Sequence, residues 1–150
     1  MNDLDKIVNH RLATVSLLSR RLVFRIIAES GVDITPEQWT LLYYLWKENG
    51  QSIGELSKAT QKDFANVTRI VEKLIEHGYV KKERDVNDNR SFRIFILPKA
   101  NEIKNDIKKV QEKMQDISLN GINDDEQIFI MQILDKMEKN ILKQLTSDNK

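Results

Sequence analysis

Apolar side chains recur every three or four positions at both ends of the chain, which is the spacing of one face of a helix. Over residues 4–28 this stripe consists of Leu4, Ile7, Val8, Leu12, Val15, Leu18, Leu22 and Ile26. A later stripe consists of Ile103, Ile107, Val110, Met114 and Ile117. The last one consists of Phe129, Ile130, Ile133, Leu134, Met137, Ile141 and Leu145. We therefore predict long terminal helices of the bundle or coiled-coil type, interrupted at Gly31 and at Asn120-Gly121.

Capping signals mark where the shorter helices of the middle segment begin. Thr35 is followed by Pro36 and Gln38, and Ser52 is followed by Glu55, so each site matches a capping box. The first of these helices ends at Asn49-Gly50, and the second ends in a turn at Thr60-Gln61. Near the C-terminus, Asn123 with Glu126 matches a looser cap.

A longer helix follows over residues 62–77, and Gly78 provides its stop. Its inner face consists of Val67, Ile70, Val71, Leu74 and Ile75. The period then changes to that of strands over residues 79–84 and 92–97, with a polar loop between them. Two strands around one such loop predict a hairpin, and Pro98 ends it before helix resumes.

Helix, turn, helix and hairpin over residues 51–93 form the order of a winged helix-turn-helix, whose second helix enters the DNA major groove. With the apolar face turned inward, Thr68 lies at the edge of an outward face that consists of Lys62, Ala65, Asn66, Arg69 and Lys73. Asn reads adenine, Arg reads guanine, and Thr or Ala meets a thymine methyl. Each charge taken singly is also ordinary for a solvated surface, so the ordered set carries the DNA-binding hypothesis.

The amino-acid composition excludes several classes of protein function but does not by itself indicate DNA binding. The 150 residues include 24 basic and 23 acidic side chains, a net charge of +1. The absence of cysteine excludes disulfides, thiolate catalysis and cysteine zinc sites, and it fits a reducing compartment. We expect a cytoplasmic protein, because no signal peptide or membrane-spanning stretch is visible.

A family resemblance becomes visible in the second helix and the hairpin. The run from Asn66 to Val80 resembles the recognition helix of the MarR (multiple antibiotic resistance regulator) family, and the run from Arg84 to Ser91 resembles its wing. The family's Asp-x-Arg pattern falls on Asp88 and Arg90. The resemblance covers nearly the whole chain. It implies a mainly α fold with a small β-hairpin wing, flanked by N- and C-terminal dimerisation helices.

The resemblance also implies a division of labour along one domain of residues 1–150. Residues 1–30 and 100–147 would interlock with those of a second copy, although an intramolecular bundle is the alternative. Residues 35–97 would form the DNA-binding lobe, with Asp88 holding Arg90 for the minor groove. The expected DNA contacts are Ser52, Lys62, Ala65, Asn66, Thr68, Arg69, Lys73, Arg84, Asp88, Asn89 and Arg90. The function implied is a homodimeric repressor that binds a near-palindromic operator.

The family pattern is not matched everywhere. Ile96-Leu97 and Ala100 stand where the family usually has Leu-Thr and then Gly, so the usual threonine cap of the next helix is in doubt. Many members release DNA when a small phenolic or anionic compound binds. Candidate lining residues for such a pocket are His10, Arg11, Trp39, Tyr43 and Trp46. Trp and Tyr at helical spacing are more often core residues than ligand contacts, and the lack of cysteine excludes the family's thiol switches.

Two other classes of function remain to be weighed. An enzyme is not expected, because the two histidines, His10 and His77, stand alone and no catalytic or phosphate-loop motif occurs. We expect no cofactor or metal, and His77 suits the C-terminus of a helix. A winged-helix module that binds protein instead of DNA is the alternative, and it would require exposed apolar residues on the recognition helix. Phe64 is one such residue, unless it contacts a thymine methyl or packs in the turn.

Overall fold

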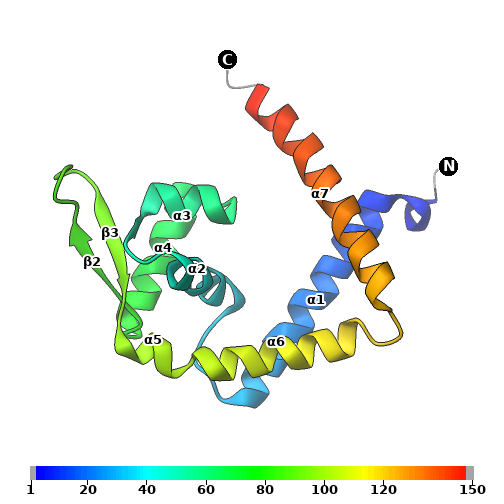
Figure 1. Cartoon of the computed structure of the whole chain (residues 1–150), viewed down its shortest axis with the longest axis horizontal. Helices are drawn as coiled ribbons and strands as arrows, with labels where there is room; N and C mark the ends of the chain where they lie inside the picture. Colours follow the sequence, from blue (N-terminus) through cyan, green and yellow to red (C-terminus); the bar gives the residue numbers. More distant parts are fainter. Residues whose placement is uncertain (1–2, 148–150) are drawn as a thin grey trace. The chain divides into compact units, whose positions relative to one another are not determined.

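Helices form most of the computed structural model, which describes residues 3–147 (Figure 1). The first two and last three residues of the predicted 1–150 span lie outside the described residues. The chain divides into two units, Met1–Met114 and Gln115–Lys150, and each is described by itself. The predicted class, mainly helical with a small β wing, is confirmed. No helix among the described residues has the length and apolar character needed to cross a membrane.

The first helix begins later than the apolar stripe predicts. A short 3-10 helix, η1 (Leu4–Lys6), comes first, and α1 (Val8–Ser30) follows after Ile7 adopts an extended backbone. Asp3 stabilises the 3-10 turn because its carboxylate accepts from the backbone N–H of Asp5. Gly31 ends α1 in the left-handed conformation (φ 74°), as its position in the sequence predicts.

Both predicted capping boxes are confirmed. Thr35 and Gln38 cap α2 (Pro36–Lys47) reciprocally, and Ser52 and Glu55 do the same for α3 (Ile53–Thr60). The turn after α3 places Gln61 at φ 57°, which lets the chain reverse within three residues. The two helices therefore begin where the sequence predicts.

The recognition helix α4 (Phe64–Glu76) is shorter than the predicted span of residues 62–77. Its N-cap is Asp63, whose carboxylate accepts from the backbone N–H of Asn66 at 2.7 Å. Lys62 therefore lies in the turn before the helix, not on its outward face, which corrects the prediction. At the other end, Gly78 adopts φ 76° as predicted.

The predicted hairpin is confirmed and gains a third strand. Strands β2 (Val80–Arg84) and β3 (Phe92–Ile96) pair antiparallel, with Lys82 opposite Ile94. The extra strand β1 (Gln51–Ser52) pairs with the other edge of β3, so the order is β1-β3-β2. Two residues are too few to show an alternating pattern, which explains why the sequence does not reveal β1.

One hydrophobic core lies beneath the helices and the sheet of the first unit. Its fully buried large side chains are Leu41, Leu42, Leu45, Leu56, Val67, Val71, Leu74, Val80 and Ile94. These residues come from α2, α3, α4, β2 and β3, so the inner face of α4 packs against a leucine-rich core. Close packing of this kind fixes which face of α4 points outward.

The segment after the wing forms α5 (Pro98–Glu102) and α6 (Lys104–Ser118). Leu97 occupies the N-cap of α5 without a side-chain cap bond, so the threonine cap in doubt is indeed absent here. In the second unit, α7 (Asp124–Ser147) begins with two reciprocal 2.9 Å bonds between Asn123 and Glu126, which confirms the predicted cap.

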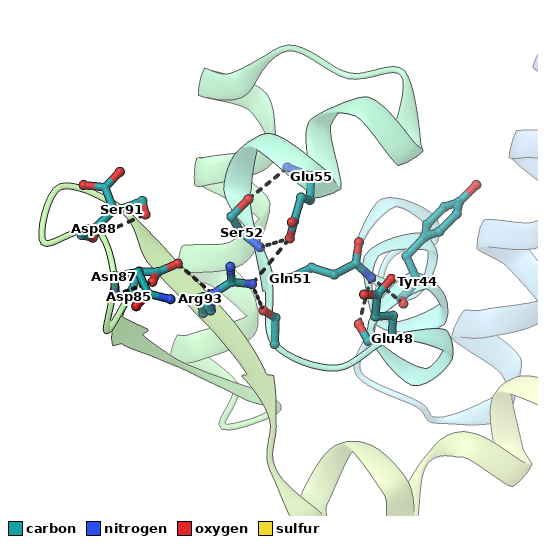
Figure 2. Close-up of polar contacts among 11 residues, drawn as sticks. Tyr44, Glu48, Gln51, Ser52, Glu55, Asp85, Asn87, Asp88, Ser91 and Arg93 are labelled. Carbon is teal, nitrogen blue, oxygen red and sulfur yellow. Dashed lines mark hydrogen bonds and ion pairs between the residues drawn. The ribbon is translucent and has the colours of Figure 1, made fainter.

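Arg93 fastens the wing to the rest of the lobe (Figure 2). Its Nε donates to Oδ2 of Asp85 at 2.7 Å, and its Nη1 donates to the carbonyl of Gly50 at 2.9 Å. The same Nη1 lies 3.7 Å from Oε2 of Glu55 on α3. The backbone N–H of Asn87, followed by the Arg93 guanidinium, lowers the pKa of the Asp85 carboxyl. One guanidinium thus joins the wing, the β1 segment and α3.

Gln51 makes a second connection at the start of the sheet. Its amide Nε2 donates at 2.8 Å to the carbonyls of both Tyr44 and Glu48, at the end of α2 (Figure 2). The side chain is buried, and it gives a donor to the Glu48 carbonyl at the helix end and a second donor to the Tyr44 carbonyl, which also accepts from the N–H of Glu48. The end of α2 and the edge of the sheet are therefore held together.

Replacing Arg93 by Gln should destabilise the fold at neutral pH. We expect Arg93→Gln to lower the midpoint of thermal unfolding by roughly 3–8 °C, because the Asp85 carboxylate and the Gly50 carbonyl lose their donor. The control Lys81→Gln removes an exposed ion pair with Glu83 in the same sheet and should shift the midpoint by less than about 2 °C.

The effect of Arg93→Gln should also depend on pH. Because the folded-state pKa of Asp85 lies below its ordinary value, its stabilisation is present above the unfolded-state pKa of about 4. That stabilisation is lost as the pH falls through the lower, folded-state pKa. Calorimetry of the parent and the variant should show their difference shrinking in acid, and a constant difference would contradict this account.

Candidate nucleic-acid interface

The outward face of α4 carries the residues that the sequence predicts for base reading. Asn66, Arg69 and Lys73 follow one another at helical spacing, opposite the buried side chains that anchor the helix. Nη2 of Arg69 donates to Oδ1 of Asn66 at 2.7 Å, and Nζ of Lys73 pairs with Glu76 at 3.0 Å. The Asn66–Arg69 bond holds an amide and a guanidinium together, which is the pair of groups that reads adenine and guanine.

The smaller predicted contacts lie around the first turns of α4. Ala65 is exposed, and Thr68 is half-buried with its hydroxyl donating to the carbonyl of Phe64 at 2.9 Å. The hydroxyl of Thr68 is therefore used locally, and its methyl group is the part suited to an apolar contact. Ser52 is likewise occupied, because its Oγ accepts from the N–H of Glu55 as the cap of α3.

The wing loop, residues 85–91, is ordered by its own carboxylates. Oδ1 of Asp88 accepts from the backbone N–H of Arg90 at 3.0 Å, and the carbonyl of Asp88 accepts from the N–H of Ser91 at 3.1 Å. The resemblance implies that Asp88 holds the Arg90 side chain, whereas here it fixes the backbone at Arg90. This bond fixes the backbone at the tip of the hairpin, where the Arg90 side chain is exposed.

Arg84 at the end of β2 supports the other side of the loop. Its Nη1 donates to the carbonyl of Asn89 at 3.2 Å, and its guanidinium lies 5.7 Å from the centre of the Phe92 ring. Lys82 lies over the same ring at 5.1 Å. These contacts collect cationic side chains on the wing, which suits phosphate contact.

Two hollows connect α4 with the wing. One, of about 280 Å3, is lined by Ile53, Phe64, Thr68, Val71, Glu72, Ile75, Lys82, Arg90, Phe92 and Ile94. The other, of about 420 Å3, is lined by Ser52, Ile53, Gly54, Phe64, Asp85, Asn87, Asp88, Arg90, Ser91, Phe92 and Arg93. Four of the predicted DNA contacts, Ser52, Thr68, Asp88 and Arg90, line these two hollows, so parts of α4 and the wing loop share one side of the lobe.

The C-terminal end of α4 is tied to two other segments. His77 is the C-cap, as its sequence position predicts, and its Nδ1 lies 3.8 Å from Oδ2 of Asp33. The hydroxyl of Tyr79 donates to the carbonyl of Asp33 at 3.0 Å, and Nζ of Lys99 donates to the carbonyl of His77 at 2.6 Å. Burial raises the pKa of the Tyr79 hydroxyl, so it remains a donor. These contacts hold the helix at its far end.

The five residues predicted for an effector pocket lie on α1 and α2. They are the exposed His10 and Arg11 on α1, and Trp39, Tyr43 and Trp46 on one face of α2. Trp46 donates from its indole to Oδ1 of Asn101 at 3.2 Å and lies under Lys104 at 5.4 Å. Trp46 therefore borders the α5–α6 segment, Trp39 packs half-buried against the core, and Tyr43 keeps much of its ring exposed.

Sequence reasoning misses two residues that organise this interface. The sequence alone does not distinguish Arg93 from the other basic residues, because its hydrogen-bond partners lie on other elements. Asp63 has a detectable signal, since Asp directly before a helix is a preferred N-cap residue. The predicted interface is thus supported by residues that were not themselves among the predicted DNA contacts.

Comparison with known proteins places this arrangement in a family. Residues 34–92 match the model of the MarR family. The HTH-type transcriptional regulator BilQ of Clostridioides difficile (strain CD3) is 32% identical over 72 residues, which cover 48% of this chain and 49% of BilQ. The match thus spans about half the length of that relative.

Solved structures agree over a longer part of the chain. A MarR protein from Peptoclostridium difficile DA00132 superposes with a TM-score of 0.82 and 26% identity, covering 96% of this chain and 95% of that one. BpsR of Bordetella bronchiseptica, a protein whose DNA binding is regulated by 6-hydroxynicotinic acid, has the same fold. Its TM-score is 0.84 at 21% identity, covering 92% of this chain and 97% of BpsR. The winged helix-turn-helix at residues 34–92 thus matches the MarR family, and the chain has the fold of a solved MarR protein along nearly its whole length.

Proposed function

We propose that this chain is a transcriptional regulator that binds double-stranded DNA in a sequence-specific manner. The observation that carries the proposal is the outward face of α4, where Asn66, Arg69 and Lys73 project beside a cationic wing. Base-reading groups on a helix next to phosphate-binding groups on a hairpin are what a winged helix-turn-helix needs. A protein-docking face would instead present several exposed apolar residues.

In the proposed complex, α4 enters the major groove and the wing reaches the neighbouring minor groove. Asn66 and Arg69 contact base edges, Lys73 and Arg84 contact phosphates, and Arg90 enters the minor groove. Lys62 in the turn and Ser52 at the start of α3 approach the DNA backbone. Because α4 and the wing are fastened to one lobe, both contacts are made without rearranging the protein.

We also propose that the regulator acts as a homodimer. On α1, the exposed apolar residues include Leu12, Val15, Leu17 and Leu18. On α7, they include Phe129, Ile130, Met131, Ile133, Ile141 and Leu145. Helices with this much exposed apolar surface need a covering partner, and a second copy supplies one. A two-fold dimer reads two half-sites of a near-palindromic operator.

The proposed mode of action is repression that a small molecule relieves. A dimer seated on its operator blocks transcription, and binding of an aromatic or anionic compound near the predicted pocket residues of α2 would change the position of the reading lobes. BpsR shares the fold and has DNA binding that 6-hydroxynicotinic acid regulates. The exposed Tyr43, with the half-buried Trp39 and Trp46 on the same face of α2, would supply the aromatic contact for a ligand of that kind.

Two arginine variants test the DNA contacts. Arg69→Ala should weaken binding to the duplex upstream of the chain's own gene by roughly 5- to 100-fold and relax base preference, because it removes a base contact. Arg90→Ala should lower affinity for all duplexes and reduce the salt slope by about one. Fluorescence anisotropy at several salt concentrations measures both effects.

A control variant and a decisive outcome complete that test. Lys108→Ala removes one exposed charge from α6 and should leave affinity within about twofold of the parent. Parent-like binding by both arginine variants would refute the assigned contacts. Equal, weak binding of the parent to the natural duplex and a scrambled one would move the proposal toward a protein-binding module or another operator.

The dimer predicts a defined mass in solution. Sedimentation equilibrium of the parent should give twice the 17.6 kDa chain mass. The double change Ile141→Glu with Leu145→Glu should give a monomer and abolish operator binding, because it places charges in the apolar face of α7. The matched double change Lys139→Glu with Lys143→Glu, at the same spacing on the opposite side of α7 from the apolar stripe, should stay dimeric. A monomeric parent would overturn the proposal.

The effector proposal predicts a coupled change in stability and DNA binding. In a panel of benzoate and hydroxybenzoates, at least one compound at a hundredfold excess over its Kd should raise the thermal midpoint by roughly 5–10 °C. The same compound should weaken DNA binding, and Tyr43→Ala should diminish both effects. A panel that changes neither quantity would count against this site.

A further inference from the structure

Phe64 is an exposed aromatic residue at the start of the recognition helix. It is the first residue of α4, and its side chain is 62% exposed. The apolar residues Val67, Ile70 and Val71 that follow it on the same helix are buried. Phe64 therefore contributes little to the core, although a phenyl ring left in water carries a free-energy cost.

The position of Phe64 is set by its neighbours. Asp63 caps α4 immediately before it, which fixes the backbone at the first turn. Phe64 lines both hollows between α4 and the wing, together with Ile53 of α3 and Arg90 at the wing tip. The ring therefore borders both hollows, on the side of the lobe that carries the proposed contacts Thr68 and Arg90.

The surroundings of Phe64 argue against a protein-docking surface. Of the large apolar residues that line the two hollows, only Phe64 is exposed, since Ile53 and Phe92 are half-buried. Charged side chains, Glu72, Lys82 and Arg90, line the smaller hollow as well, so the exposed apolar surface around the ring is small. A docking surface needs a contiguous apolar area. The carboxylate of Asp63 beside the ring also disfavours a DNA phosphate at this helix end. A base edge is the group that remains.

We propose that Phe64 is a specificity-determining residue that contacts the 5-methyl group of a thymine in each operator half-site. The inference rests on the proposed DNA binding and names what one position of the site recognises. The N-terminal residues of a recognition helix meet base edges, and the thymine methyl is the apolar group that base edges present in the major groove. An apolar ring at this point selects thymine over cytosine.

Uracil substitution isolates this contact. An operator duplex is first obtained by selection from a random library with the full-length parent. Each thymine of one half-site is then replaced in turn by deoxyuridine, which removes the 5-methyl group and leaves base pairing intact. The dissociation constant is measured for the parent, Phe64→Ala and Phe64→Leu. Thermal unfolding and circular dichroism check that each variant folds like the parent.

The expected result is a coupling between one thymine and Phe64. For the parent, uracil at one position should weaken binding roughly three- to tenfold, which is about the effect of one methyl group. Phe64→Ala should lose affinity on the thymine duplex and show no further loss with uracil there. Phe64→Leu should retain part of the methyl effect. The control Asn66→Ala should bind more weakly but respond to uracil like the parent.

Two failures are distinguishable. If the parent selects a specific duplex but Phe64→Ala shows the same uracil profile as the parent, the inference is overturned while the proposed function stands. If selection yields no duplex that the parent binds more tightly than a scrambled one, the proposed function fails, and this inference fails with it.

Discussion

The attachment of the wing through Arg93 is the constraint on which the reading surface depends. A two-stranded hairpin by itself is only marginally stable in water, and β1 adds just two residues to the sheet. The rigid guanidinium of Arg93 joins Asp85 of the wing loop to the carbonyl of Gly50 with two short hydrogen bonds. A lysine has one point of attachment and could not hold both partners in the same plane.

The spacing between α4 and the wing follows from that attachment. The inner face of α4 rests on the leucine-rich core, and His77 and Tyr79 tie its end to the segment at Asp33. Asp85 and Asp88 order the loop that carries Arg90. Major-groove and minor-groove groups are therefore set at a fixed separation before DNA arrives, which lowers the entropy cost of binding.

The terminal helices differ from the lobe in how complete their packing is. The lobe buries its leucines fully, whereas α1 and α7 expose many large apolar residues along their length. The lobe alone determines how one half-site would be read. In the proposed dimer, the partner that covers the exposed faces would determine how far apart the two reading lobes lie. A compound bound near those helices would therefore change operator affinity by changing that separation.

Local hydrogen bonding is the part of this protein that the sequence determines by itself. The capping pairs Thr35–Gln38, Ser52–Glu55 and Asn123–Glu126 join residues three positions apart, so spacing along the chain reveals them. The helix stripes, the turns at glycines and the β2–β3 hairpin are equally local, and they also carry the family resemblance and most of the candidate DNA contacts. The predicted start of the recognition helix is too early because a local signal, the N-cap at Asp63, places Lys62 in the turn before the helix.

Only the tertiary structure decides how these pieces are fastened together. The bond from Arg93 to Gly50 spans 43 positions, and the one from Tyr79 to Asp33 spans 46. No periodicity links such residues, because their proximity results from packing the helices and the sheet on one core. The exposure of Phe64 has the same origin, since an apolar residue at a helix start is left in water only when the surrounding fold offers it no cover.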